Sequence, residues 1–593
     1  YTSRIYSIGR PRGSDRVSFD HTPGRMSYLW ISVLIIVGVS CDEFHDEPQQ
    51  LLLTAAGAQD LPKEVKRDWM DLGEKELDAA LALQRNMGVA KNVILFIGDG
   101  MGVSTISAAR VFNMHQMGRS FEESSMSWEK FPHVGLSKTY NTDRYVPDSA
   151  GTATAFLTGN KAPYGTIGVD QHAVRYNCSS VPGREVKSFL KLGHEKGKWA
   201  GLVTSTRVTH ATPAAAYAHS ANRDWEARSP DPSCRDIARQ LVEDNSYLRV
   251  ILGGARLAFL PANTSDPEYP DQPRNPNSGS VRADNMNLIE VWHTDKNTSK
   301  RLSAETFKYV QNQTQFTNVD PTKVDYLLGL FEPFHMQYEA DRAGDPWGEP
   351  SLAEMTRKAI QILKRGDKGF ALLVEGGRID HAHHDNKAYK SLYDVLALSE
   401  AVQAAVSETE ASDTLIVVSA DHSHVFTMGG YAAWNDHIMG FPNAFGKAGD
   451  GKPYTVVGYT NGPGWTANNN QTGAGNNTAG IKDRNVLTEE QTKEKNYLQD
   501  AAIPLNSETH GGEDVGVYAS GPMAHLFHGT HEQSYIAHVI MYASCVGPYN
   551  QHCQGGPKVP PDCPTPPTGG SAKLSVMSLF MFMLCFLAKL ISL

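Results

Sequence analysis

The segment VPDSAGTATA, residues 146–155, places the hydroxyl of Ser149 directly after an acid and before a run of small, helix-compatible residues. We therefore expect Ser149 to begin a helix, where unpaired backbone N–H groups and the helix dipole favour a nearby anion. A serine is a poor nucleophile at its ordinary pKa, and no neighbouring residue is an obvious general base. Metal ions are the alternative activator that the rest of the chain offers.

Carboxylates and imidazoles recur along the chain in the mixture that binds Zn²⁺ and Mg²⁺. One acid or histidine of this kind is usually a solvated loop residue, but several with the same local pattern indicate a site. The segments that carry them are IGDGMG (97–102), RVTHAT (207–212), VEGGRIDHAHHDN (374–386), SADHSHV (419–425) and ETHGGED (508–514).

Three of these segments follow short, continuous apolar runs, at residues 93–97, 370–374 and 415–418. Such runs are typical of strands buried on both faces, which belong to mostly parallel α/β sheets. Ligands in those sheets bind beyond the carboxyl ends of the strands. The sequence therefore predicts an α/β fold with a large, mostly parallel central sheet and a site at one of its edges. The residues expected at that edge are Asp99, Glu375, Asp380, Asp421 and His422.

On these motifs the chain resembles the alkaline phosphatases of the animal, membrane-anchored type, over roughly residues 62 to 546. The resemblance implies helices on both faces of the sheet and hydrolysis of phosphate monoesters at alkaline pH. It also implies two zinc ions, one magnesium ion and a covalent phosphoserine intermediate on Ser149. Thr212 stands where many vertebrate forms have Ser, which keeps a hydroxyl at that position.

The same resemblance assigns a role to each residue of the site. The first zinc would be held by Asp380, His384 and His510. The second zinc would be held by Asp99, Ser149, Asp421 and His422. Magnesium would take Asp99, Thr212 and Glu375. Arg223 would clamp phosphate, His381 would contribute to phosphate binding, and His210 would tune the magnesium site.

A fourth cation site is implied by three segments, DPEYP (266–270), GLFEP (329–333) and GEPSL (348–352), which resemble a calcium site of animal members. Calcium accepts an all-oxygen set of carboxylates and carbonyl groups. Here one acid is Glu where the vertebrate pattern has Asp, and the preceding loop is two residues longer. Ordinary surface acids are the alternative. The matching ligands are Glu268, the carbonyl of Phe331, Glu332 and Glu349.

His383 and His424 are expected to lie outside the ligand set because the family spacing skips them. His437 is expected to be a surface residue rather than a ligand, because the segment that contains it is a poor place for catalytic residues. Residues 430–505 interrupt the motifs and resemble the crown insertion at a dimer interface, so the catalytic domain is expected at 62–429 and 506–546. Apolar residues at helical spacing in 61–84 predict a helix. The resemblance makes it an arm that joins two subunits, and a helix covering its own core is the alternative.

The two ends of the chain indicate a secreted protein that is anchored to the outer face of the plasma membrane. Residues 1–41 read as an extension and a signal peptide whose apolar stretch is too short to span a membrane. A spacer within 547–573 and an apolar tail at 574–593 are typical of a GPI-attachment signal, with a retained tail anchor as the alternative. Six Asn-X-Ser/Thr sequons agree with the secretory route.

Composition agrees with a large secreted enzyme. The formal charge is −10 and no long basic run occurs, so nucleic acid is not an expected partner. Among seven cysteines, spacing alone leaves the pairing open. The resemblance implies bridges between Cys178 and Cys234 and between Cys545 and Cys553. Cys563 is then free, paired between chains, or near a processing site.

Two other classes of function fit parts of the sequence. A sulfatase on a similar scaffold uses a Cys/Ser-X-Pro-X-Arg segment, which the residues around Ser149 lack. A phosphodiesterase of this scaffold typically uses Thr as nucleophile and lacks the full magnesium set. A GPI-anchored receptor with an inactive site would not need an intact ligand set. The residues present therefore favour a phosphomonoesterase.

Overall fold

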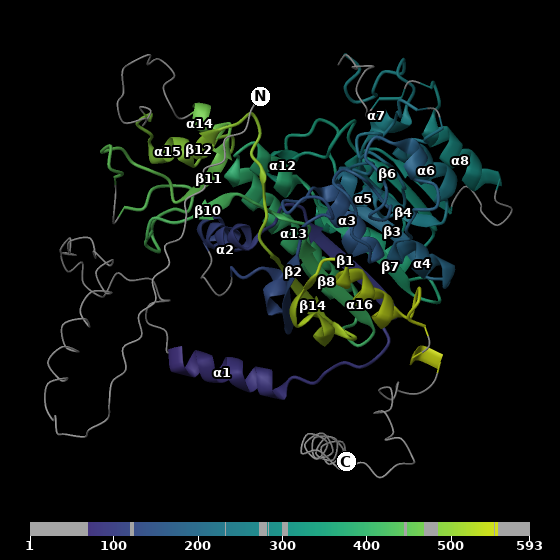
Figure 1. Ribbon diagram of the computed structural model, residues 1–593, viewed down its shortest axis with the longest axis horizontal. Helices are drawn as coiled ribbons and strands as arrows, with labels where there is room; N and C mark the ends of the chain where they lie inside the picture. Colours follow the sequence, from purple (N-terminus) through teal and green to yellow (C-terminus); the bar gives the residue numbers. More distant parts are fainter. Residues whose placement is uncertain are drawn as a thin grey trace, which may run out of the picture. The chain divides into compact units, whose positions relative to one another are not determined.

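The computed structural model describes residues 69–118, 124–231, 233–271, 281–282, 284–298, 306–443, 447–467, 484–550 and 552–554. Its centre is a ten-stranded sheet in which every neighbouring pair is parallel except the two pairs that include β14 (Figure 1). The predicted α/β fold is therefore confirmed. In spatial order the strands are β15 (Gly529–Glu532), β2 (His133–Lys138), β14 (Val515–Ser520), β8 (Thr414–Ala420), β1 (Asn92–Gly98), β7 (Phe370–Gly376), β3 (Trp199–Arg207), β4 (Leu248–Gly254), β6 (Tyr326–Leu330) and β5 (Phe307–Val310).

The three predicted apolar runs are β1, β7 and β8, with β1 between the other two, and every residue in them is buried. Alternate residues of β1 belong to two separate hydrophobic cores. Leu95 belongs to the core that includes residues of α3 (Ser149–Thr158) and α16 (Tyr535–Ser544), and Phe96 belongs to the core on the other face of the sheet. That second core is formed with α2 (Val103–Met117), α11 (Leu352–Leu363) and α13 (Ala388–Glu408). Helices on both faces explain why these strands are continuously apolar rather than alternating.

The register of these strands places their carboxyl ends level with one another. Ile97 lies opposite both Glu375 and Ser419, so Asp99 and Asp421 follow their strands at the same edge. A small two-stranded sheet at that edge pairs β9 (Ser423–His424) with β13 (His510–Gly511) and brings His510 opposite His424. The edge predicted from the sequence is therefore where distant segments meet.

Shorter elements connect these layers. Residues 426–504 contain a three-stranded sheet of β10 (Phe426–Met428), β11 (Val457–Gly462) and β12 (Ala501–Pro504), and the limits of the crown insertion stay a prediction. The remaining α-helices are α1 (Trp69–Ala82), α4 (Phe189–Glu195), α5 (Ala211–Ala214), α6 (Ile237–Asp244), α7 (Arg256–Phe259), α8 (Leu288–Thr298), α9 (Gln313–Thr317), α10 (Glu339–Arg342), α12 (Arg378–His384), α14 (Gly464–Ala467) and α15 (Glu489–Thr492).

The predicted N-terminal helix is α1, and none of its residues is buried. Its large apolar side chains are exposed, among them Trp69, Leu77 and Leu81. The alternative that this helix covers the core of its own chain is therefore wrong.

Disulfides join Cys178 to Cys234 and Cys545 to Cys553. Within the described part of the chain, no helix is both long enough and apolar enough to cross a membrane. The predicted leader, the spacer, the apolar tail and Cys563 lie outside the described residues.

Candidate active site

Ser149 is the first residue of α3, as its sequence context predicts. Asp148 caps the helix, because its side chain accepts a hydrogen bond from the Gly151 N–H at 3.2 Å while its own backbone is extended. Ser149 is only 1% exposed, so its hydroxyl faces the interior of the site rather than bulk water. The free N–H groups of this first turn favour an anion beside that hydroxyl.

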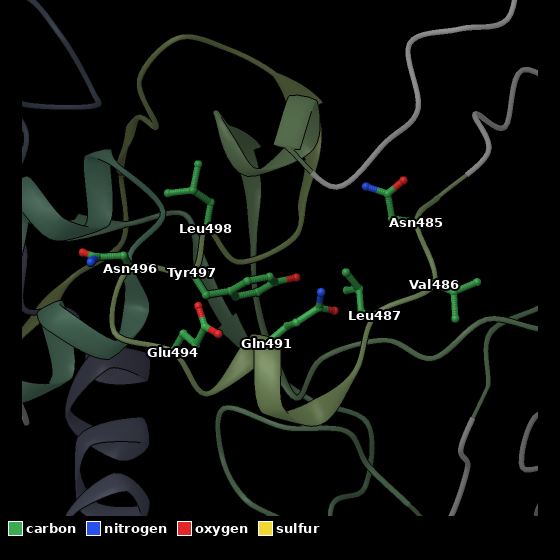
Figure 2. A pocket seen from close by; sticks show the side chains of 8 residues that line it. All are labelled: Asn485, Val486, Leu487, Gln491, Glu494, Asn496, Tyr497 and Leu498. Carbon is green, nitrogen blue, oxygen red and sulfur yellow. The ribbon is translucent and has the colours of Figure 1, made fainter.

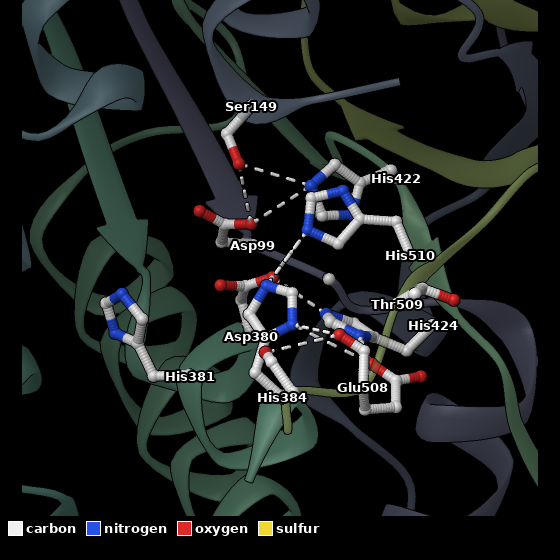
Figure 3. A network of polar contacts seen from close by, with 12 residues as sticks. Asp99, Ser149, Asp380, His381, His384, His422, His424, Glu508, Thr509 and His510 are labelled. Atoms are coloured by element: carbon white, nitrogen blue, oxygen red, sulfur yellow. Dashed lines mark hydrogen bonds and ion pairs between the residues drawn. The ribbon is translucent and has the colours of Figure 1, made fainter. Parts of the chain in front are cut away.

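The Ser149 hydroxyl lies among donors from the ends of β1 and β8 (Figure 3). Its oxygen is 3.2 Å from His422 Nε2 and 3.4 Å from Asp99 Oδ1. His422 Nε2 is in turn 3.5 Å from Asp99 Oδ1 and 3.2 Å from Asp421 Oδ2. Ligands bound to tetrahedral zinc at its usual bond lengths are about 3.4 Å apart. These four side chains therefore fit a zinc ion.

A second group of donors comes from α12 and β13. His384 Nε2 and His510 Nε2 each lie 3.3 Å from Asp380 Oδ1, and they are 3.1 Å from each other. The Nδ1 atoms donate to backbone carbonyls, His384 to Glu508 at 2.6 Å and His510 to Pro147 at 2.8 Å. Both Nε2 atoms thus present lone pairs to the same point, which is the arrangement of metal-binding histidines.

A third group consists of hard oxygen atoms. Asp99 Oδ2, Thr212 Oγ1 and Glu375 Oε1 are buried and have no hydrogen-bond partner in the described part of the chain. The other Glu375 oxygen accepts from Thr204 Oγ1 at 2.5 Å, which fixes the carboxylate. Burial raises the pKa of Glu375 to about 7, and burial together with the charge of Asp421 holds the pKa of Asp99 well above its usual range. Unsatisfied oxygens of this kind fit a magnesium ion.

Arg223 lies between the start of α3 and His210. Its Nη1 donates to Asp148 Oδ2 at 3.0 Å, and its Nη2 is 3.1 Å from His210 Nε2. Burial opposes ionisation of Asp148, but the Arg223 charge and two backbone N–H groups outweigh it and lower the pKa of that carboxyl. His381 follows on α12, with its ring centroid 5.3 Å from that of His210. The predicted phosphate-binding residues, Arg223 and His381, thus both lie beside His210.

Three residues that the sequence analysis did not select belong to this network. His335 packs on His381 with ring centroids 4.1 Å apart. His424, expected outside the ligand set, is 2% exposed, and its Nε2 lies 2.7 Å from Asp380 Oδ1. Its Nδ1 contacts the carboxylate of Glu508. Burial opposes the charged form of His424, but these two carboxylates raise its pKa to about 10.

The other two histidines expected outside the ligand set have different surroundings. His383 is buried, with Nε2 3.1 Å from the Thr105 hydroxyl and Nδ1 2.8 Å from the Tyr459 hydroxyl. His437 is half-buried and stacks on His115, with ring centroids 4.9 Å apart. Both are engaged by these neighbours rather than by the donor groups around Ser149.

The acids expected at a calcium site also meet in space. Glu332 and Glu349 are 3% and 2% exposed, and both accept hydrogen bonds from Gln337, at 2.9 Å each. One oxygen each of Glu268 and Glu349 is buried without a hydrogen-bond partner among the described residues. Burial raises the pKa of Glu332 to about 8. The alternative of ordinary surface acids is therefore wrong.

Arg256 supplies the charge that partly balances this acidic cluster. Its guanidinium donates to Glu268 at 2.8 Å and to the Phe331 carbonyl at 2.9 Å, so it binds two of the expected ligands. Asp345 is close enough to raise the pKa of both Glu268 and Glu332. Neither Arg256 nor Asp345 was selected from the sequence.

A cavity of 590 Å³ lies elsewhere, and none of the donor residues lines it (Figure 2). It is formed within residues 485–498, around α15, and its lining carries no histidine and a single carboxylate. The lining residues are Asn485, Val486, Leu487, Gln491, Glu494, Asn496, Tyr497 and Leu498. The chemistry of the chain is therefore concentrated at the sheet edge and not in this cavity.

A mostly parallel α/β sheet with three donor groups and a buried serine at its edge defines a metal-dependent hydrolase of the phosphate-binding type. Comparison with known proteins agrees with this class. The family model described as alkaline phosphatase matches residues 90–546. The chain is 48% identical over 486 residues to the alkaline phosphatase of Gadus morhua, covering 81% of this chain and 97% of that protein.

A second relative is the tissue-nonspecific alkaline phosphatase of Gallus gallus, 47% identical over 492 residues, or 82% of this chain and 90% of the relative. The crystal structure of Thermus thermophilus alkaline phosphatase is similar in fold, with a TM-score of 0.53 and 22% identity over 81% of this chain and 94% of that one. The chain belongs to the alkaline phosphatase family, whose members are metal-dependent phosphomonoesterases.

The contact between Asp148 and Arg223 makes a prediction about stability. Asp148→Asn removes the charge that balances the partly buried guanidinium, and we expect a loss of about 3 kcal/mol in the free energy of unfolding at neutral pH. Because folding lowers the Asp148 pKa, its contribution is complete above the unfolded value of about 4 and disappears as pH falls through the folded value. Urea unfolding of both proteins between pH 7 and pH 3 measures the difference.

The matched control is Glu195→Gln, which removes one partner of an exposed pair with Lys187. We expect this exchange to leave the unfolding midpoint almost unchanged. A difference between parent and Asp148→Asn that stayed constant down to pH 3 would contradict the assignment to a carboxylate with a lowered pKa.

Proposed function

We propose that this protein hydrolyses phosphate monoesters at alkaline pH, with two zinc ions, one magnesium ion and a phosphoserine intermediate on Ser149. The observation that carries the proposal is the position of the Ser149 hydroxyl. It begins a helix, is buried, and lies 3.2 Å from His422 Nε2 and 3.4 Å from Asp99 Oδ1. A serine placed within a zinc-binding set can act as a nucleophile without a general base of its own.

The proposed metal ligands follow the three donor groups. One zinc would be held by Asp380, His384 and His510, the other by Asp99, Ser149, Asp421 and His422, and magnesium by Asp99, Thr212 and Glu375. Bound there, the zinc ions would lower the pKa of the serine hydroxyl, stabilise the departing ester oxygen and supply a nucleophilic water. The donor distances and the three unsatisfied oxygens support these assignments.

The chain's own groups then position the phosphoryl group. Ser149 Oγ attacks phosphorus as the ester oxygen leaves, and the backbone N–H groups of α3 face the charge on the phosphoryl oxygens. Arg223, held by Asp148, offers a planar pair of N–H groups to two of those oxygens. Hydrolysis of the Oγ–P bond releases phosphate and restores the serine.

The alkaline optimum follows from the same cationic site. A phosphate dianion held by Arg223, the α3 terminus and the bound cations would dissociate slowly at neutral pH, so we propose that its release limits turnover. Hydroxide competes with phosphate for a cationic site. Turnover should therefore rise with pH, and inorganic phosphate should inhibit less strongly in the alkaline range.

A calcium ion is proposed at the acidic cluster of Glu268, Glu332, Glu349 and the Phe331 carbonyl. Support comes from the unsatisfied oxygens of Glu268 and Glu349, whose burial without a cation would be unfavourable. Arg256 now donates to two members of this set, so it would have to share them with the ion. The nearby Asp345 would add a further carboxylate.

We also propose a homodimer at the extracellular face of the plasma membrane, held there by a GPI anchor. The exposed apolar residues of α1 and the family resemblance support the dimer, and the sequence of the C-terminal tail supports the anchor. Sedimentation should give twice the mass of the chain, and a phosphatidylinositol-specific phospholipase should release the protein from cells. A monomer, or a protein retained on the membrane after that treatment, would contradict the respective proposal.

Ser149→Ala tests the nucleophile. The parent should cleave p-nitrophenyl phosphate far faster than the bis(p-nitrophenyl) ester or the sulfate, and Ser149→Ala should reduce that rate by orders of magnitude while keeping the fold. Residual turnover is expected because water can attack the substrate directly. Acid quenching with labelled substrate should trap phosphate on Ser149 in the parent. Label on another residue, or a preference for the diester or sulfate, would contradict the proposed reaction.

Removal of metal tests the cofactors. Chelation should abolish hydrolysis of p-nitrophenyl phosphate, and Zn²⁺ together with Mg²⁺ should restore it more fully than either ion alone, because the nitrogen-containing and all-oxygen donor groups differ in preference. Elemental analysis of the purified protein should find two zinc and one magnesium per chain, with calcium as a fourth ion. Full activity in zinc-free protein would overturn the proposal.

A further inference from the structure

Glu508 precedes β13 by two residues and is attached to α12 through its backbone. Its N–H donates to the His384 carbonyl at 2.9 Å, and its carbonyl accepts from His384 Nδ1 at 2.6 Å. The peptide of Glu508 therefore fixes both the backbone and the ring of His384. His510, which continues the same segment, is held by Pro147 at 2.8 Å.

The Glu508 side chain is connected through His424 to Asp380, which belongs to the same donor group as His384 and His510. One carboxylate oxygen accepts from the Val425 N–H at 2.8 Å, and the other contacts His424 Nδ1. His424 Nε2 lies 2.7 Å from Asp380 Oδ1. Ionised carboxylates only accept hydrogen bonds, so His424 donates from both ring nitrogens and joins Glu508 to Asp380 (Figure 3).

The His424 ring has almost no freedom to move away from this position. A Cβ atom added at Gly100 would lie 2.4 Å from His424 Nε2, so only a glycine leaves room for the ring there. The ring of His383 packs against the ring of His424, with centroids 4.8 Å apart. The Glu508 carboxylate is completely shielded from solvent. A buried, close-packed bridge of this kind is suited to orient a ligand rather than to exchange protons with water.

We propose that Glu508 is a positioning residue which, through His424, orients the Asp380 carboxylate and with it the group of Asp380, His384 and His510. The inference rests on the proposed function, in which that group holds the first zinc. The second group has other supports, since Asp421 Oδ1 accepts from the backbone N–H groups of Gly100 at 3.0 Å and His422 at 2.8 Å. Loss of the Glu508 charge should therefore weaken the binding of the first zinc and leave the binding of the second zinc unchanged.

Zinc release from the purified holoenzyme to an excess of chelator measures this directly, with p-nitrophenyl phosphate turnover followed in parallel. In Glu508→Gln the backbone contacts to His384 remain, but the anionic acceptor for His424 is lost. Removal of such a partner typically lowers metal affinity about 10- to 100-fold, so we expect one zinc to leave faster than in the parent by about that factor and the other to leave at the parent rate. Glu513→Gln, an exposed acid in the same segment, is the matched control and should change neither rate.

The route through His424 is tested by a double variant. If Glu508 acts through His424, then Glu508→Gln should add little to the release rate of His424→Asn, whereas independent effects would multiply. Urea unfolding of each variant identifies any that has lost its fold, and Glu508→Gln alone then decides the selectivity. Unchanged release, equal acceleration of both zinc ions, or fully multiplicative effects in the double variant would overturn the inference.

The outcome is separable from that of the proposed function. A parent protein that holds no zinc or does not hydrolyse the monoester contradicts the proposed function, and the positioning role of Glu508 fails with it. The other case is an active parent that holds two zinc ions and a Glu508→Gln variant that releases both at the parent rate. That result contradicts the positioning role of Glu508 alone.

Discussion

The rest of the structure depends on negative charge gathered away from water at one edge of the sheet. Asp99, Glu375 and Asp421 are fully buried and Asp380 nearly so, and the charge of Arg223 acts to lower the pKa of Asp99 against this burial. Isolated buried carboxylates are strongly unfavourable, and burial together with repulsion from neighbouring carboxylates holds the pKa of Asp99 well above its usual range. Bound cations would resolve this conflict, so metal binding should be linked to the stability of this edge.

The scaffold meets the constraint by making the edge rigid. Asp99 and Asp421 follow adjacent parallel strands in matched register, and Asp380 and His384 lie one helical turn apart on α12. The His510 segment is tied by its pairing with β9 and by the backbone of Glu508. Donors placed in this way lose little freedom when a cation binds, which favours a preorganised site over one assembled by the ligand.

Local patterns predicted the parts of this structure that local physics decides. Continuous apolar runs identified β1, β7 and β8, because burial on both faces leaves its mark in each strand. The acid before Ser149 identified the start of α3, because residues that cap a helix lie next to its first turn in the sequence. Which donors share one cation came from family resemblance, since no periodicity links residues hundreds of positions apart.

The features that were missed depend on side-chain contacts between distant loops. His424 and Glu508 are 84 residues apart, and Arg256 reaches the acidic cluster across 75 residues to the Phe331 carbonyl, so neither contact has a signature within a sequence window. The exposed apolar face of α1 had the spacing of an ordinary core helix, and only the structure separates the two. Sequence patterns report burial and local conformation, whereas tertiary packing decides which residues hydrogen-bond to a metal-binding side chain.

The two histidines of the DHSH sequence illustrate how such partners decide a role. His422 directs Nδ1 toward the Ser423 carbonyl at 3.3 Å, which leaves the Nε2 lone pair facing Ser149, Asp99 and Asp421. His424, two residues later, has both ring nitrogens occupied by carboxylates and therefore has no lone pair to offer a cation. The same residue type thus serves as a donor at one position and as a support for a donor at the next. The hydrogen-bond partners of each ring, and not its proximity to the site, determine which of the two it is.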